Sequence, residues 1–186
     1  HVELRRRIDR SLLRECLLNV FSGNGRDLES LALAKPTVLV DHGAALAGMD
    51  EVAFAEVVRS SVRILGDDRR LQGVKSEADS PPANVRRYWK KVAELHDVPA
   101  DGLGAAVQSA WGSAVLGHLV QPALLRLGPP GDSHWECPSC ARRHLDRAAG
   151  VCTSCTTQLS TASIDARRPE DDYYAYQASL GDGGFR

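Results

Sequence analysis

The segments Trp135-Glu-Cys-Pro-Ser-Cys140 and Gly150-Val-Cys-Thr-Ser-Cys155 decide the fold of the C-terminal part of this chain. Each contains a Cys-x-x-Cys pair, and the tight turn within such a pair points both thiols in the same direction. Two pairs can place four thiolates around one tetrahedral ion, and zinc suits such a site because it is redox-inert and accepts four sulfur ligands. The sequence therefore predicts a zinc ribbon with the ligands Cys137, Cys140, Cys152 and Cys155.

Four cysteine ligands leave no coordination position open for water, so the expected metal is structural rather than catalytic. Two disulfides would instead require an oxidising compartment, and no signal peptide is recognised in the chain. A thioredoxin-like redox pair would need one Cys-x-x-Cys at the start of a helix in a βαβ unit. An iron–sulfur cluster also uses four cysteines, and the spacing alone does not exclude it.

The residues around the cysteines suggest a locally positive surface. Arg142, Arg143 and Arg147 lie between the two pairs, and we expect a contact with nucleic acid or a neighbouring domain there. His144 is expected in the ribbon hairpin and not among the ligands, because four thiolates already fill the shell. His134, just before the ribbon, is expected in a solvated loop.

Size and composition are those of an ordinary soluble globular protein. The 186 residues, 43% hydrophobic and 25% charged, are enough for one domain or two small ones. A net charge of −1 argues against polyanion binding over the whole surface, so any nucleic-acid contact has to be local. No apolar run reaches the roughly 20 residues that span a bilayer, which predicts a protein without membrane contact. Free cysteines in a metal-binding pattern predict a reducing, cytoplasmic location.

Hydrophobic periodicity predicts a mostly α-helical scaffold in front of the ribbon. Apolar residues at three-to-four spacing predict helices over 2–21, 51–65, 84–96 and 101–119. The first helix is expected to bury one face, which includes Leu4, Ile8, Leu12 or Leu13, Cys16 and Val20. We also expect a short helix over 27–33 that is capped by Asp27, a short strand over 37–40 and a polar surface loop over 71–82.

The stretch Gly128-Pro-Pro-Gly131 breaks the chain and predicts a domain boundary. We expect a helical accessory region over 1–128, a β-hairpin zinc ribbon over 129–160, and a polar connector with the start of a further motor domain over 161–186. The ribbon is too short to bury enough apolar surface, so the metal is expected to supply much of its folding free energy. Because the chain starts at His1 and ends in mid-pattern at Phe185-Arg186, we expect an internal fragment of a larger protein.

No self-contained active site is recognisable in the sequence. It has no phosphate-binding Gly-x-x-x-x-Gly-Lys-Ser/Thr loop, no Gly-x-Ser-x-Gly elbow and no His-Glu-x-x-His pair. Asp67 and Asp68 are expected in the loop after a helix. The best nucleic-acid candidate is a basic cluster in the helix over 84–96, where Tyr88 and Trp89 either stack on bases or pack in the core. Its members are Arg86, Arg87, Lys90 and Lys91.

The cysteine block, with Asp172-Tyr-Tyr-Ala-Tyr176 and the closing Phe185-Arg186, resembles the cysteine-bearing insert of large bacterial DEAD/DEAH-box helicases of superfamily 2. These helicases occur in anti-phage defence systems such as DISARM. Residues 60–67 (Ser-Ser-Val-Arg-Ile-Leu-Gly-Asp) and 86–88 (Arg-Arg-Tyr) resemble the region between their two motor domains. Where the family has further histidine or glycine around the ribbon, this chain has Asp146, Ala148 and Ala149.

This resemblance implies an accessory, zinc-bearing region of an ATP-dependent DNA helicase or translocase. Its partners would be DNA and the neighbouring RecA-like domains, and ATP and Mg²⁺ would bind only in those motor domains. Only the four cysteines carry over from the family, because the motor motifs are absent from the sequence and the chain itself has no catalytic motif. The alternative is a zinc-ribbon adaptor that recruits a protein partner without motor activity.

Overall fold

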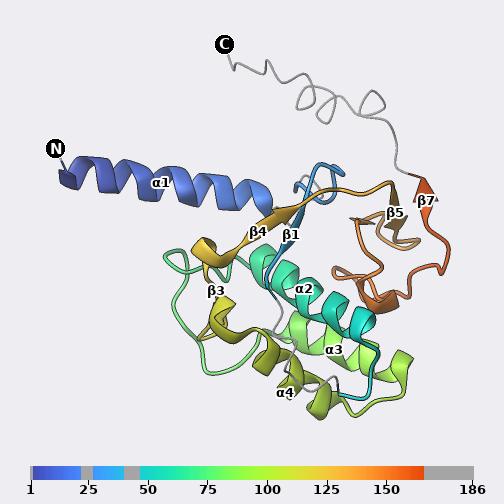
Figure 1. Ribbon diagram of the computed structural model, residues 1–186. Coiled ribbons are helices and arrows are strands. Elements are labelled where there is room, and N and C mark those ends of the chain that lie inside the picture. The colour runs from blue at the N-terminus through green and yellow to red at the C-terminus, as the bar shows by residue number, and fades with distance from the viewer. Residues whose placement is uncertain (1, 22–26, 40–46, 166–186) are drawn as a thin grey trace.

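The structure is a computed structural model that describes residues 2–21, 27–39 and 47–165 (Figure 1). The α-helices are α1 (Val2–Val20), α2 (Glu51–Asp67), α3 (Ala83–His96) and α4 (Ala100–Ala110). Short 3-10 helices lie at Gly112–Ala114 (η1), Pro122–Leu124 (η2) and Ala148–Gly150 (η3). The strands are β1 (Lys35–Thr37), β2 (Val115–Leu116), β3 (Leu119–Val120), β4 (Arg126–Gly128), β5 (Ser133–Glu136), β6 (Arg143–His144) and β7 (Ile164–Asp165).

Helix α2 is the centre of the fold. It begins at the N-cap Asp50, whose carboxylate accepts the Ala53 N–H at 2.9 Å and satisfies one of the free donors of the first turn. Its apolar stripe is buried, which confirms the helix predicted over 51–65; the stripe consists of Phe54, Val57, Val58, Val62 and Leu65. Each such side chain contributes about 1.5–3 kcal/mol when it leaves water. In Figure 1, α3 and α4 lie on one side of α2 and the strands β1 and β4 on the other.

Helix α3 confirms the helix predicted over 84–96 and buries its two aromatic side chains against α2. The indole N–H of Trp89 donates to Ser61 Oγ of α2 at 2.8 Å. The hydroxyl of Tyr88 donates to the carbonyl of Ala148 at 2.9 Å, which joins α3 to η3. Tyr88 and Trp89 therefore belong to the core and are not available to stack on nucleic-acid bases.

The helix predicted over 101–119 is wrong in its second half. Helix α4 ends at Ala110, and Gly112 then takes a positive φ of 48°, which a helix cannot continue through. Residues Gly117 and His118 also lie in the left-handed region, with φ of 54° and 56°. Two successive residues of this kind form the turn of a tight hairpin, which here connects β2 to β3.

Two smaller predictions near the N-terminus also need correction. The strand lies at Lys35–Thr37 and not over 37–40; it pairs antiparallel with β4, and residue 40 lies outside the described residues. Residues 27–34 form hydrogen-bonded turns and no helix. Asp27 nevertheless has the predicted capping role, because its Oδ1 accepts the Ser30 N–H at 2.8 Å.

The ribbon contains a three-stranded antiparallel sheet in the order β6-β5-β7. Trp135 of β5 pairs with His144 of β6, and His134 pairs with Ile164 of β7. Strand β7 therefore lies where the sequence suggested only a polar connector. His134 is 1% exposed, so the expectation of a solvated loop residue is wrong: its place in the central strand buries it.

Helix α1 confirms the predicted position but not the predicted burial. In Figure 1 it extends away from the rest of the molecule, and its C-terminal end packs on the body. Leu17 and Phe21 are buried there, and the Phe21 ring packs directly on Gly66 of α2, where a Cβ would clash with it. Most of the residues expected to be buried are exposed, namely Leu4, Ile8, Leu12 and Cys16.

The architecture is thus mixed, with helices and small sheets around a four-cysteine cluster, and not the mostly helical one expected. Within the described part of the chain, no helix is both long and apolar enough to cross a membrane. The start of a further motor domain, expected within 161–186, falls largely on residues 166–186, which lie outside the described residues.

Candidate metal centre

The four predicted cysteines come together at one point of the ribbon. Their Sγ atoms all lie within 4.8 Å of one another. Cys137 Sγ is 3.4 Å from Cys155 Sγ, and Cys140 Sγ is 3.6 Å from Cys152 Sγ, so each close pair joins the two Cys-x-x-Cys segments. All four are free cysteines and not disulfides. Cys137 and Cys152 are buried, whereas Cys140 and Cys155 lie at the surface.

Two equivalent turns position these thiols. In the first, the Ala141 N–H donates to the Cys137 carbonyl and the Cys137 N–H donates to the Arg142 carbonyl, both at 2.9 Å. In the second, the Thr156 N–H donates to the Cys152 carbonyl at 3.1 Å, and the Cys152 N–H donates to the Thr157 carbonyl at 2.9 Å. The fourth residue after the first cysteine has a positive φ in both turns, 56° in Ala141 and 60° in Thr156. Each segment therefore forms the same knuckle.

The sulfur positions fit a single tetrahedral ion. A zinc–sulfur distance of about 2.3 Å places the four sulfurs of a regular tetrahedron about 3.8 Å apart. The two short separations of 3.4 and 3.6 Å lie close to this value. Four soft thiolates can hold zinc, and iron is an alternative with the same ligands. The centre has the form of a closed structural site, since no fifth ligand or open position is needed.

The thiols of the second cysteine pair differ in acidity. Burial raises the pKa of the Cys152 thiol far above its usual range, and the nearby Cys140 and Cys137 raise it further. Burial also raises the pKa of Cys155, but hydrogen bonds with Thr157, Cys137 and Cys140 outweigh this and lower it to about 6. Several thiolates at such short range repel one another, and a divalent cation removes this repulsion and stabilises the deprotonated form.

A buried ionic network joins the ribbon to α2. We use this name for the five charged residues Asp27, Glu29, Arg63, Asp67 and Arg142. Arg63 of α2 lies at its centre, 2.6 Å from Glu29 Oε1 and 3.2 Å from Asp27 Oδ1. The same guanidinium donates to the carbonyl of Arg143 in β6 at 3.2 Å. These bonds fix the strand that follows the first cysteine pair against the central helix.

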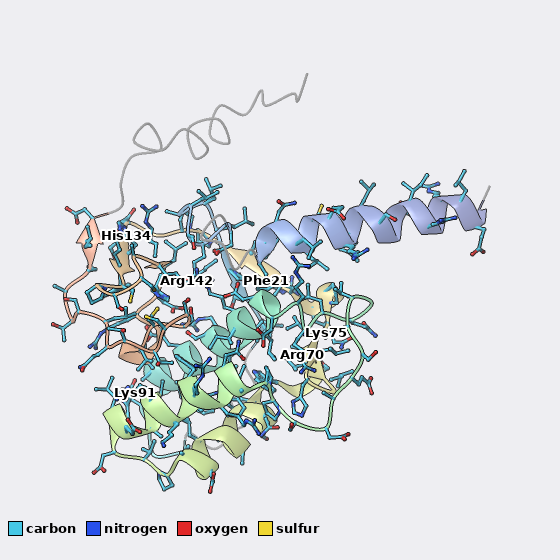
Figure 2. The ribbon with its side chains drawn as sticks, turned by 180° about the vertical axis from the view of Figure 1, so that it is seen from behind. Phe21, Arg70, Lys75, Lys91, His134 and Arg142 are labelled. Carbon is cyan, nitrogen blue, oxygen red and sulfur yellow. The ribbon has the colours of Figure 1, made fainter. Side chains whose placement is uncertain are left out.

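Arg142 belongs to this network and not to the ribbon surface. Its Nη2 lies 2.7 Å from Asp67 Oδ2 and 3.3 Å from Asp27 Oδ2, and its side chain is only 7% exposed. Figure 2 shows Arg142 in the interior of the molecule, whereas Lys91 lies at the periphery. The expected nucleic-acid contact of Arg142 finds no support in this position. Asp67 is the last residue of α2 and a buried partner of Arg142, not the loop residue that was expected.

The network holds three carboxyl groups and two guanidinium groups, so it has an excess of negative charge when all are ionised. Burial raises the pKa of Glu29 to about 7, although Arg63 and the Leu145 N–H at 3.0 Å lower it. His144 is affected in the opposite direction: burial, with Arg63 and Arg142 nearby, lowers its pKa well below the usual value. The imidazole beside Arg63 is therefore neutral at pH 7.

The raised pKa of Glu29 predicts a specific pH dependence. Between about pH 4.5 and 7 the folded protein holds a proton on Glu29 that the unfolded chain has released. This contribution to the free energy of unfolding is therefore complete below pH 4.5 and is lost as the pH rises to about 7, by at most about 1.4 kcal/mol per pH unit.

A Glu29→Gln variant tests this dependence, because glutamine keeps an acceptor for the Leu145 N–H but does not titrate. Urea unfolding of both proteins from pH 4.5 to 8 should show that wild type loses stability relative to the variant up to about pH 7. A difference that stays constant with pH, or that grows in favour of wild type, would contradict the assignment.

The second cysteine pair is positioned by contacts of η3 with α2 and α3. The Ala149 N–H donates to Glu56 Oε2 at 2.7 Å, and His96 Nε2 lies 2.9 Å from the Ala149 carbonyl. Arg59 of α2 forms an ion pair with Asp146 at 3.1 Å just before η3. Both halves of the ribbon therefore rest on the helical part, although they lie far from it in the sequence.

The remaining basic candidates fall into two groups. Arg86, Arg87, Lys90 and Lys91 are exposed on the outer face of α3. Arg143 and Arg147 are half-buried, and the Nε of Arg147 donates to the Ser160 carbonyl at 3.2 Å. The structure thus separates an exposed basic face on α3 from ribbon arginines that are largely engaged within the fold, and the nucleic-acid contacts of both groups stay predictions.

Sequence reasoning missed that Arg63, Asp27 and Glu29 hold the ribbon in place. One signal was present, because Arg63 interrupts the apolar run of α2 between Val62 and Ile64. The helical period, however, places Arg63 about 160° around α2 from the apolar stripe, so the pattern itself gives no reason to bury this arginine or to expect an acidic partner. The acidic partners of Arg63 could not be identified from the local sequence pattern.

Comparison with known proteins finds no matching family model, no matching curated protein and no matching solved structure. The proposed function therefore depends on the site itself.

Proposed function

We propose that this chain is a zinc-binding accessory region in which the metal maintains a protein surface and takes no part in catalysis. The observation that supports this proposal is the convergence of four cysteine Sγ atoms within 4.8 Å of one another. A closed thiolate shell provides no water to activate and no position for a substrate. The ribbon that this shell holds packs on α2 and α3. The metal therefore also stabilises the contact between the ribbon and the helical part.

We further propose that the region serves an ATP-dependent DNA helicase or translocase. The support for this step is the resemblance of the cysteine block and of residues 60–67 and 86–88 to the region between the motor domains of DEAD/DEAH-box helicases. In this proposal, ATP and Mg²⁺ bind in the RecA-like domains of the parent protein. The present region contributes a rigid, metal-stabilised surface near the DNA.

The face of α3 is the surface best suited to contact DNA. Its four basic side chains are exposed, while Tyr88 and Trp89 on the opposite side of the helix are buried. Among the described residues, Lys91 forms an ion pair with Glu94 at 2.9 Å, in which both side chains are about half exposed. The face therefore offers positive charge to phosphates without rings for base stacking, which predicts binding that is independent of base sequence.

Replacing Arg86, Arg87 and Lys90 together by alanine is expected to weaken DNA binding and to flatten its salt dependence. Each lost phosphate contact lowers the slope of log K against log salt by about 0.7–0.9, so three contacts correspond to a change of about 2. Fluorescence anisotropy of the full chain with a labelled oligonucleotide, measured over a series of salt concentrations, gives this slope.

A matched control is the pair of exposed basic residues Arg69 and Lys75, which lie away from α3 in the segment after α2. Their replacement by alanine removes two positive charges, against three in the α3 variant, and should leave most of the slope unchanged. If the α3 variant binds DNA like wild type, or if wild type shows no salt-dependent binding, the α3 face is not a DNA contact.

A protein-interaction adaptor is the second candidate. The observation in its favour is the run of exposed apolar side chains on α1, because exposed apolar surface of this kind marks protein contacts. An adaptor needs no affinity for DNA, so the anisotropy experiment separates the two functions. Metal binding is common to both.

A further inference from the structure

Helix α1 presents an apolar stripe that the rest of the described chain leaves uncovered. Leu4 and Leu12 are both 59% exposed and Ile8 is 50% exposed, and the thiol of Cys16 is exposed as well. These four residues, at a constant spacing of four, are called the α1 stripe below. A helix that exposes its apolar face gains little from tertiary packing, which is the main source of helix stability in proteins. The α1 stripe therefore requires a covering surface.

The α1 stripe faces away from the body of the protein. At 100° per residue, the mean direction of its members is about 180° from that of Leu17 and Phe21, which contact the body. The body-facing side of α1 borders a cavity of about 400 Å³ near Gly73 and Val74, and its walls include the polar side chains of Arg7 and Arg14. Figure 2 shows Phe21 at the packed end of the helix and the remainder of α1 extending outward.

The pattern of the α1 stripe is symmetric about its own midpoint. In an antiparallel pair of two α1 helices centred on residue 10, Leu4 of one copy faces Cys16 of the other, and Ile8 faces Leu12. A two-fold interface requires this kind of self-complementarity, because the same patch must face itself.

Charge and shape favour the antiparallel arrangement over the parallel one. Residues 1–10 hold four arginines against Glu3 and Asp9, whereas residues 11–20 hold one arginine and one glutamate. Parallel pairing places the two positive halves together, and antiparallel pairing places each beside a neutral half. The body is attached at the C-terminal end of α1, so antiparallel helices also keep the two bodies at opposite ends (Figure 1).

We propose that α1 is a homodimerisation helix, and that two copies of this chain associate through antiparallel packing of their α1 stripes. This interaction surface lies on a different element from the metal centre and the basic face of α3, so it goes beyond the function proposed above. A dimer would present two α3 faces and two ribbons at the ends of a central helix pair.

Analytical ultracentrifugation of the full chain tests the association. At micromolar concentration wild type should sediment with twice the monomer mass of 20.1 kDa, and Ile8→Glu with Leu12→Glu should restore the monomer mass. Leu116→Glu is the matched control, since Leu116 is 51% exposed but lies in β2. The Leu116→Glu protein should stay dimeric. Metal content and a circular dichroism spectrum close to those of wild type verify that the charged variant folds. A monomeric wild type, or a dimer that the glutamates leave intact, would overturn the proposal.

The orientation has its own test with a short thiol-specific cross-linker. A Leu4→Cys variant should cross-link through its new cysteine to Cys16 of a second copy, and mass spectrometry should identify the peptide that joins the two sites. In a parallel pair, Cys16 would instead link to Cys16 of the partner copy. Recovery of that product as the main one would contradict the antiparallel arrangement.

Discussion

A Cys152→Ser variant is expected to purify without its stoichiometric metal and with an unfolded ribbon. Cys152 is fully buried at the centre of the cluster, and serine replaces a soft thiolate by a hydroxyl that does not bind zinc at pH 7. Structural zinc sites contribute apparent binding energies of about 10–16 kcal/mol in small peptides, and the ribbon has few apolar contacts to compensate. Loss of the metal in this variant should remove most of the ordered structure around η3.

Elemental analysis of the purified full chain gives the metal content, and amide hydrogen exchange localises the loss of structure. Wild type should contain about one metal per chain, and the variant much less. Protection in residues 134–159 should collapse. Cys16→Ser is the matched control, because Cys16 is exposed on α1 and distant in sequence from the cluster, and it should keep full metal content. A Cys152→Ser protein that retains one metal per chain would show that the four cysteines do not act as a unit.

An Arg63→Met variant is expected to lose about 3–5 kcal/mol of unfolding free energy. Methionine has similar length and packs well, so the loss comes from the charge and not from a cavity. Without Arg63, the buried carboxyl groups of Asp27 and Glu29 lose their closest positive partner, and the Arg143 carbonyl loses a donor. Of the two guanidinium groups in the network, Asp27 then keeps only Arg142 and Glu29 loses its partner Arg63. Removing one partner of a buried ion pair costs far more than the pair contributed.

Chemical denaturation of metal-loaded protein measures this loss. Lys91→Met is the matched control, because it breaks the Lys91–Glu94 pair in which both side chains are about half exposed, and its effect should be much smaller. Arg63→Lys should not restore stability, since one ammonium group cannot reproduce the several directed bonds of the guanidinium. If Arg63→Met unfolds at the same denaturant concentration as wild type, the network does not hold the ribbon on α2.

The parts of the fold that the sequence predicted well depend on local pattern. The helices at Glu51–Asp67 and Ala83–His96 follow from apolar spacing. The cysteine cluster follows from the spacing of the two pairs, because the ligands of a closed site need only converge. The cap at Asp27 was likewise local, although the turn that it stabilises does not extend into a helix.

The parts that the sequence did not predict depend on contacts between distant residues. Arg142 looked like a surface charge, and only its approach to Asp27 and Asp67 shows that it is buried. His134 was expected in a solvated loop, but it is buried because β6 and β7 pair with β5 on its two sides. The helix expected over 101–119 ended early because Gly112 and Gly117 adopt a backbone conformation that composition alone does not reveal. The amphipathic pattern of α1 indicated a helix correctly, but a pattern cannot tell whether the covering surface belongs to the same chain.

X-ray absorption spectroscopy of the purified full chain tests the metal centre most directly. At the zinc edge, the fine structure should fit four sulfur neighbours at about 2.3 Å with no nitrogen or oxygen in the first shell. Visible absorbance with stoichiometric iron, or a first shell that contains oxygen or nitrogen ligands, would contradict a closed four-cysteine zinc site.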